Sequence, residues 1–242
     1  YDEEIRFTDE GIGRLLARIE ALGLNKRTLT ILAADHGEEF LDHGWLAHTN
    51  TLYQELIRVP LIFRLPGPPS PRVVNQPVSL LSLTPTILDL VGTTYDTESF
   101  MAESLRSLLE GKPSAASGDI ISEVDFVPLM KGKFVTSVHK KSIIHEGHKL
   151  IRDDKAGRIE LYDLLADPLE KHNLSESKAQ LRDELIGRLD QQLDVAIDRA
   201  IGIQARMVGA GEVSSMRGLG YVGESGDEQD DHTASTTRPV NP

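Results

Sequence analysis

Cysteine is absent from this sequence of 242 residues. Without thiols the chain forms no disulfide bond, offers no thiolate to a metal ion and has no cysteine nucleophile. Any covalent or metal chemistry in this chain therefore depends on other side chains.

Long apolar runs and an excess of positive charge are also missing. No apolar run approaches the roughly 18 residues that a membrane-spanning helix needs. Lys and Arg together number 26 against 38 Asp and Glu, which gives a formal net charge of −12. Nucleic acids and anionic membranes are bound by clustered Lys and Arg. We therefore expect no membrane span and no nucleic-acid partner.

The N-terminus has neither a methionine nor the basic and apolar pattern of a signal peptide. Tyr1 begins inside a segment with helical spacing of apolar residues. We therefore interpret the sequence as a processed product or as part of a longer gene product, and the missing signal is no guide to the compartment.

Apolar periodicity predicts helix and strand in alternation in the first half. Residues 3–22 carry apolar side chains at helical spacing, and Gly23 follows as a typical helix end. Two short apolar runs, 28–34 and 59–63, predict strands that are buried on both faces of a mostly parallel sheet.

Asp35, His36 and Gly37 directly follow the first of these strands. In open α/β sheets, ligands bind outside the carboxyl ends of the strands. Carboxylate and imidazole are both ligands of divalent metals, and a glycine after them allows a sharp turn. Two ligands do not complete a site, so others must come from elsewhere. Further candidates are Asp42, His43, His48 or residues outside this chain.

The alternative is a purely structural role, in which Asp35 to Gly37 form an ordinary turn from strand to loop. Aspartate and glycine favour turns in any protein. The tripeptide alone does not distinguish the two interpretations.

The second half has shorter strand patterns followed by one long helix. A turn at 153–157, with a glycine in its last position, predicts a hairpin, and 178–201 has leucines at a spacing of four. This order predicts a small antiparallel sheet covered by a helix. The predicted strands are 120–124, 134–138, 142–144, 149–152 and 158–162. Residues from 202 onward are poor in core-forming side chains, and we expect disorder there.

The segment at 35–63, DHGEEFLDHGWLAHTNTLYQELIRVPLIF, resembles the metal-binding segment of the sulfatase branch of the alkaline phosphatase superfamily. The same family is matched, in its own order, by YDEEIRFTDEGIGRLLARIEALGL, PTILDLVG, ELYDLLADPLEKHNL and RGLGYV. The resemblance thus covers nearly the whole chain.

The resemblance implies an α/β fold: a partial alkaline-phosphatase-like αβα sandwich with a small C-terminal α+β subdomain of antiparallel sheet plus helix. In this division, residues 1–117 are the C-terminal part of the catalytic α/β domain. Residues 118–201 form the small subdomain, and 202–242 are a largely disordered tail.

The resemblance also implies the C-terminal part of a metal-dependent sulfuric ester hydrolase. Asp35 and His36 are then metal ligands, and His48 is a catalytic residue at the family's position of a Lys or His that contacts the substrate's anionic oxygens. The implied cofactor is a divalent cation, first calcium. Manganese and zinc are alternatives because the calcium-binding members carry Asp-Asn where this chain has Asp-His. The implied partner is a small-molecule or glycan sulfate ester.

Two parts of the family pattern are missing from this sequence. The family's nucleophile is a Cys or Ser converted to formylglycine in a C/S-x-P-S/A-R motif, and neither this motif nor the paired-Asp metal segment before it occurs here. We therefore expect the chain to be the C-terminal half of an enzyme, inactive alone, with the N-terminal half as its partner. The family also implies a periplasmic or extracellular location.

Two other functions stay open. One is a phosphodiesterase or phosphonate monoester hydrolase, since the tetrahedral oxyanions of sulfate and phosphate require similar binding sites. The other is a non-catalytic product, either truncated or a binding module.

Two further patterns have a structural and a functional interpretation. Arg58 precedes the second strand and either reaches an anion or is structural. Asp167, Glu170 and Asn173 belong to the family's D-P-x-E-x-x-N-L signature, and we expect their side chains to cap turns.

Overall fold

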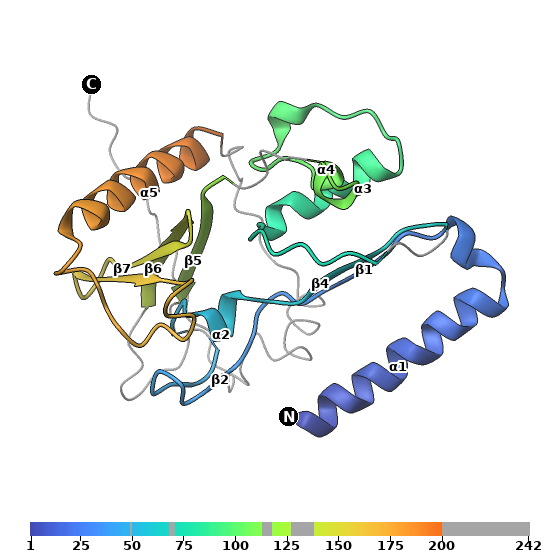
Figure 1. The fold of residues 1–242 in the computed structure, drawn as a ribbon, viewed down its shortest axis with the longest axis horizontal. Coiled ribbons are helices and arrows are strands. Elements are labelled where there is room, and N and C mark those ends of the chain that lie inside the picture. The colour runs from blue at the N-terminus through green and yellow to red at the C-terminus, as the bar shows by residue number, and fades with distance from the viewer. Residues whose placement is uncertain (49, 68–70, 113–117, 127–137, 200–242) are drawn as a thin grey trace, which may run out of the picture. The chain divides into compact units, whose positions relative to one another are not determined.

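The computed structural model describes residues 1–48, 50–67, 71–112, 118–126 and 138–199 (Figure 1). The chain divides into two compact units, and all described residues belong to the first, which comprises 1–126 and 137–200. The predicted tail at 202–242 and most of the predicted strand 134–138 lie outside the described residues.

Helix α1 (Asp2–Ala21) begins after Tyr1 with three acidic residues in its first turn and is followed by Gly23 at φ 66°. The predicted helix is therefore confirmed to within one residue at each end. Its apolar stripe is not packed, because α1 has no buried residue and Leu15 is 60% exposed. The helical spacing therefore predicts the helix but not its burial: in the described residues α1 contacts mainly the short 3-10 helix η1 (Leu24–Arg27).

Strands β1 (Thr30–Ala33) and β4 (Leu61–Arg64) pair with each other in antiparallel orientation. Both strands were predicted, but the parallel pairing and the burial on both faces were not correct. Ile62, for example, is 58% exposed. The segment between the strands holds only short elements and no long crossover helix, so the chain returns in the opposite direction.

The connecting segments carry several short elements. Those between β1 and β4 are the hairpin β2 (Glu39–Phe40) with β3 (Leu46–Ala47) and helix α2 (Gln54–Ile57). Those after β4 are η2 (Leu80–Ser82), α3 (Leu83–Leu90), η3 (Thr97–Ser99) and α4 (Arg106–Leu109). The buried Thr86 joins α3 to α4, because its hydroxyl accepts the Leu105 N–H at 2.8 Å.

The second half forms a four-stranded antiparallel sheet in the order β5-β6-β7-β8. Its strands are β5 (Ile120–Phe126), β6 (Val138–His145), β7 (His148–Asp153) and β8 (Arg158–Asp163). Helix α5 (Ala179–Arg199) packs on β6 and β7. The predicted sheet and helix are confirmed, and Gly157 has the φ of 65° that the hairpin turn requires. The predicted strand 142–144 and the last residue of the predicted strand 134–138 both lie in β6.

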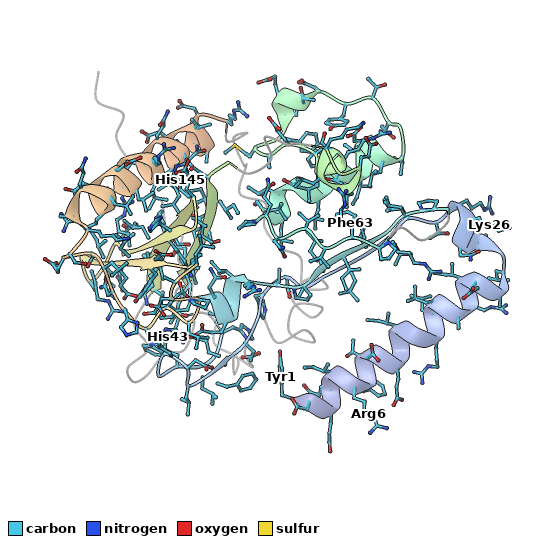
Figure 2. The ribbon with its side chains drawn as sticks, viewed as in Figure 1. Tyr1, Arg6, Lys26, His43, Phe63 and His145 are labelled. Atoms are coloured by element: carbon cyan, nitrogen blue, oxygen red, sulfur yellow. The ribbon has the colours of Figure 1, made fainter. Side chains whose placement is uncertain are left out.

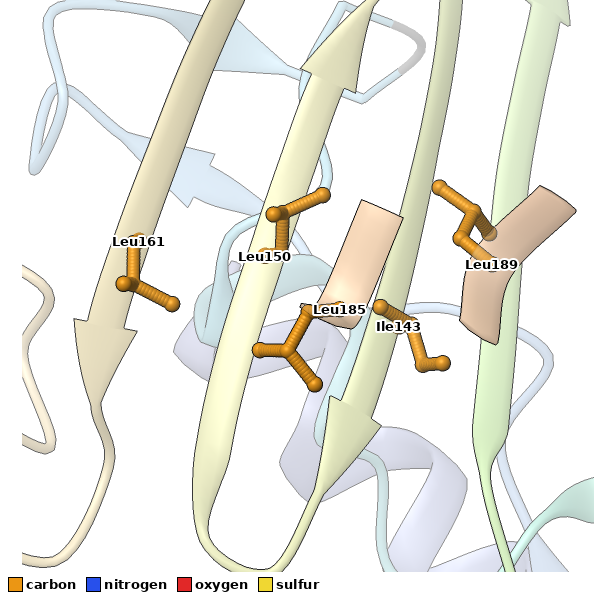
Figure 3. Packing of buried hydrophobic residues seen from close by; sticks show 5 residues of the cluster. All are labelled: Ile143, Leu150, Leu161, Leu185 and Leu189. Atoms are coloured by element: carbon orange, nitrogen blue, oxygen red, sulfur yellow. The ribbon is translucent and has the colours of Figure 1, made fainter. Parts of the chain in front are cut away.

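The hydrophobic core lies between this sheet and α5. Ile143, Leu150 and Leu161 come from three neighbouring strands, and Leu185 and Leu189 come from the helix (Figure 3). All five are 0% exposed. Leu185 and Leu189 are four residues apart and therefore share one face of α5.

Candidate functional site

A groove with a volume of about 1280 Å³ brings together the three predicted site residues, Asp35, His36 and His48. Asp35 comes two residues after the end of β1, as expected for a ligand at a strand end. Its side chain is 77% exposed and that of His36 is 41% exposed. Both are therefore accessible to a ligand in the described chain.

The His36 ring has a defined orientation. Its Nδ1 lies 2.8 Å from the carbonyl oxygen of Gly37, and its backbone N–H donates to Asp35 Oδ1 at 3.0 Å. A carbonyl only accepts, so Nδ1 carries the proton and Nε2 has a free lone pair when the ring is neutral. Nε2 lies 3.9 Å from Asp35 Oδ2. The two best ligand atoms of the pair therefore face the same region.

The imidazole of His48 lies next to that of His36. The ring centroids are 4.2 Å apart and the ring planes differ by 32°. His48 Nδ1 lies 3.3 Å from Glu38 Oε1. The Glu38 carboxylate therefore fixes the orientation of the His48 ring beside His36.

Gly37 is required for a different reason from the one predicted. It is not among the glycines with positive φ, so the sharp-turn explanation was wrong. A Cβ at this position would lie 1.9 Å from the Glu55 carbonyl oxygen, while the Gly37 N–H donates to Leu56 O at 2.8 Å. A side chain is therefore excluded because the backbone of α2 lies directly against Gly37.

His43 is held away from the groove as part of the fold. Its Nδ1 lies 2.5 Å from Glu55 Oε1, its Nε2 lies 3.1 Å from Glu170 O, and its ring stacks on Tyr53 at 3.7 Å. Both ring nitrogens of His43 therefore have partners within the fold. Neither His43 nor Asp42 lines the groove. Of the further ligand candidates, only His48 lies beside the pair.

The Asp35 and His36 donor set fits a divalent cation but does not complete its coordination. Two atoms bound to one cation at about 2.0–2.6 Å each lie at most about 4–5 Å apart, which includes the observed 3.9 Å. Across the residues with described positions, no group of three or more His, Cys, Asp or Glu is arranged to hold a metal ion. Further ligands would have to come from outside this set.

Arg58 lines the same groove and is exposed. Among the residues that the structure describes, its guanidinium forms no ion pair or hydrogen bond. It adds a positive charge to a groove that also holds two imidazoles.

A network of buried charges was missed by the sequence analysis. Lys149 Nζ lies 2.6 Å from Glu170 Oε1, and both side chains are 0% exposed. Glu160 accepts hydrogen bonds from the hydroxyls of Tyr53 at 2.7 Å and Tyr162 at 2.8 Å. The sequence did contain a signal for this network. Lys149 and Glu160 lie within predicted strands, and a charged residue that is buried in a strand needs a partner of opposite charge or a hydrogen bond.

Burial shifts the pKa values of this network in the directions expected for desolvation. It lowers the pKa of Lys149, against the opposing effect of Glu170. It also raises the pKa of Glu39, a fully buried carboxyl that accepts the Thr51 hydroxyl at 2.8 Å. The tyrosines Tyr53 and Tyr162 likewise have raised pKa values, chiefly through burial.

The D-P-x-E-x-x-N-L segment does more than cap turns. Asp167 does cap one, since it accepts the His172 N–H at 2.8 Å. Asn173 Oδ1 accepts the N–H groups of Leu161 at 3.0 Å and Ser175 at 2.9 Å. Glu170, by contrast, lies buried and accepts the Gln54 N–H at 2.6 Å, so it connects the C-terminal sheet to α2.

No helix in the described ranges is long and apolar enough to cross a membrane.

The sequence of this chain is similar to that of known sulfatases. Residues 1–93 match the family model Sulfatase. An ulvan-active sulfatase of Formosa agariphila is 26% identical over 191 residues, which are 77% of this chain and 36% of that protein. Human arylsulfatase A is 26% identical over 235 residues, 88% of this chain and 46% of that protein. The matched segments span only 16% to 46% of such curated relatives.

The solved structures show the same similarity in three dimensions. A phosphonate monoester hydrolase from Silicibacter pomeroyi is 27% identical with a TM-score of 0.63, over 79% of this chain and 39% of that one. Similar solved sulfatases have the alkaline-phosphatase-like fold, which confirms the predicted partial α/β fold. Residues 1–93 therefore match the sulfatase family, and the chain as a whole is similar to sulfatases of the alkaline phosphatase superfamily.

Proposed function

We propose that the intact protein containing this chain is a metal-dependent sulfuric ester hydrolase. In this proposal Asp35 and His36 are two metal ligands and His48 contacts the anionic oxygens of the substrate. The observation that carries it is the convergence of these side chains in one groove, with His36 Nε2 free and 3.9 Å from Asp35 Oδ2.

The cofactor we propose is a divalent cation, with calcium first and manganese or zinc as alternatives. A carboxylate suits calcium, whereas an imidazole suits zinc and manganese sites as well. When bound, such a cation polarises the ester oxygens and lowers the pKa of the nucleophile. In this proposal the imidazole of His48, held beside Glu38, donates a hydrogen bond that stabilises negative charge developing on the substrate.

We propose that the nucleophile and the remaining ligands come from an N-terminal half outside this chain. The matched segments span only 16% to 46% of the relatives, and no C/S-x-P-S/A-R motif occurs here. The coding sequence before Tyr1 tests this directly. A motif of this kind there supports the proposal, and an upstream sequence without it opposes it.

Metal binding and turnover in the intact protein test the roles of the histidines. We expect His36→Ala to weaken binding of calcium, manganese or zinc by more than the about 10- to 100-fold lost with an outer-shell partner. His48→Ala should keep metal binding and lower kcat by about 100-fold or more. His172→Ala, at a ring that is 82% exposed outside the groove, is the matched control. Loss of metal binding in the control, or none in His36→Ala, would refute the assignment.

A phosphonate or phosphate diester hydrolase is the second candidate, because phosphonate monoester hydrolases are among the similar solved structures. Comparison of kcat/KM for sulfate esters and phosphonate monoesters on the intact protein separates the two. The similar proteins include an ulvan-active sulfatase and an N-acetylglucosamine-6-O-sulfatase, so sulfated glycans are the first substrates to test. We also propose a periplasmic or extracellular location, which cell fractionation tests.

The third possibility is a non-catalytic product, suggested by the missing nucleophile. Metal-dependent turnover by the intact protein would exclude it. The domain boundaries at 117 and 201 also stay predictions, and limited proteolysis is their test.

A further inference from the structure

The buried pair of Lys149 and Glu170 joins the C-terminal sheet to the segment that carries the groove. Lys149 lies on β7, and both side chains are fully buried at 2.6 Å from each other. The second oxygen of Glu170 accepts the backbone N–H of Gln54, the first residue of α2, at 2.6 Å. One carboxylate therefore neutralises a buried lysine and fixes the start of α2.

Helix α2 is in direct contact with the residue that follows His36. The Gly37 N–H donates to Leu56 O at 2.8 Å, and there is no space for a Cβ between Gly37 and Glu55 O. The carbonyl of the same glycine accepts from His36 Nδ1 at 2.8 Å. A displacement of α2 would therefore move the acceptor that orients the His36 ring.

A second contact connects Glu170 to the same segment. Its backbone carbonyl accepts from His43 Nε2 at 3.1 Å, and His43 Nδ1 bonds to Glu55 on α2. Glu170 has a φ of 53°, a left-handed conformation that is uncommon for a residue with a side chain. Its backbone and its carboxylate therefore both hold α2 and the loop before it, the loop that carries His43 (Figure 2).

We propose that Glu170 is a positioning residue: through α2 and Gly37 it fixes the orientation in which His36 presents Nε2 to a cation. This inference rests on the proposed function of His36 as a metal ligand. Glu170 does not line the groove, so it acts through α2 and does not contact the ligand itself. Lys149 supplies the opposite charge that allows the carboxylate to be buried.

Two double variants separate the effect of the hydrogen bond from Gln54 N–H to Glu170 from the effect of the Glu170 charge. Lys149→Met with Glu170→Gln removes both charges but keeps an oxygen that can accept the Gln54 N–H. Lys149→Met with Glu170→Ala also leaves no buried charge but has no acceptor. The two variants differ in the acceptor and in the side-chain volume at position 170, and neither leaves an unpaired lysine in the core.

The first measurement is the ¹⁵N chemical shifts of the His36 ring in the intact protein without metal. We expect the Glu170→Gln double variant to keep the wild-type signature of a hydrogen-bonded Nδ1–H, and the Glu170→Ala double variant to lose it. This readout needs neither metal nor turnover. Wild-type ring signals in both variants would overturn the proposal.

The second measurement is manganese binding by calorimetry, with kcat and KM for a sulfate ester. We expect the Glu170→Ala double variant to bind manganese about 10- to 100-fold more weakly, and the Glu170→Gln double variant to bind within a few-fold of wild type. If wild type binds no metal, the proposed function fails while the ring signals still decide the positioning role. Equal affinity in all three proteins would overturn that role.

Leu189→Ala is the control for a general loss of stability. Leu189 is buried between α5 and the sheet and does not contact α2 in the described core cluster. We expect it to lower the melting temperature while the His36 signals and the manganese affinity stay unchanged. Should the Glu170→Ala double variant fail to fold, Glu170→Asp serves instead, because it keeps the charge and withdraws the acceptor by one methylene. Retained wild-type ring signals in Glu170→Asp would then overturn the proposal.

Discussion

The four-stranded sheet and the segment formed by α1, β1 and β4 differ in how they use their apolar residues. The sheet and α5 bury leucines and isoleucines completely against each other. Helix α1 buries none, and β4 exposes Ile62 to 58%. The first region completes its own core, whereas the second has an amphipathic pattern whose apolar side has no cover among the residues that the structure describes.

This comparison gives a physical reason to expect more protein around α1. Exposed apolar stripes of this kind are typical of surfaces that are covered in a larger assembly. It agrees with our proposal that an N-terminal half completes the catalytic domain.

The largest effect should come from the core of the sheet. We expect Leu150→Ala on β7 to lower the free energy of unfolding by about 2–5 kcal/mol, because it removes a fully buried side chain and leaves a cavity. Leu15→Ala on α1 should change it by less than about 0.5 kcal/mol in this chain. Urea denaturation of the two variants measures both values.

The same pair of variants sharpens the comparison in the intact protein. If an N-terminal half covers α1, Leu15→Ala should become clearly destabilising there, while the effect of Leu150→Ala is unchanged. Equal losses for the two variants in the 242-residue chain would contradict the structural difference.

Gly37→Ala should have the next largest effect. The new Cβ would lie 1.9 Å from a backbone oxygen of α2, so the two backbones must separate, at an expected cost of about 1–3 kcal/mol. Gly11→Ala is the matched change in α1, where no atom lies within 4 Å of the new Cβ. It should stabilise by about 0.5–1 kcal/mol, because alanine favours helix interiors. Thermal melts of both variants test this opposite sign.

Asn173→Ala should cost about 1–3 kcal/mol, because the backbone N–H groups of Leu161 and Ser175 lose their acceptor. Asn75, exposed in the loop after β4, provides the control. Denaturation midpoints that fall equally for the two alanine variants would rule out this role of Asn173.

The smallest effect depends on pH and concerns Glu39. Burial raises its folded-state pKa above the unfolded value, so the folded chain binds the proton more tightly. Its contribution to stability is therefore full below the unfolded pKa and is lost as the pH rises through the folded pKa. Glu39→Gln mimics the protonated form and should escape this loss.

Melting temperatures of Glu39→Gln and wild type at acidic and neutral pH measure the difference. We expect similar values near pH 4 and a higher value for the variant at pH 7 to 8. A variant that gains nothing at neutral pH would show that His43 and Lys140 compensate the buried charge fully.

The sequence by itself determined the local elements and the chemical nature of the site. Periodicity located α1 and α5, the apolar runs located β1 and β4, and the adjacent Asp35 and His36 identified a pair of ligand types. These features depend on residues close together in the chain, so local patterns contain them.

Only the tertiary structure decided which strands pair and which side chains contact each other. It paired β1 with β4 in antiparallel orientation, removed His43 from the ligand candidates, and showed that Gly37 is needed for contact with α2. It also connected Glu170 to Gln54 across 116 positions of sequence. Contacts of this kind depend on how distant segments pack. A local sequence pattern therefore does not predict which buried charged residues form a pair.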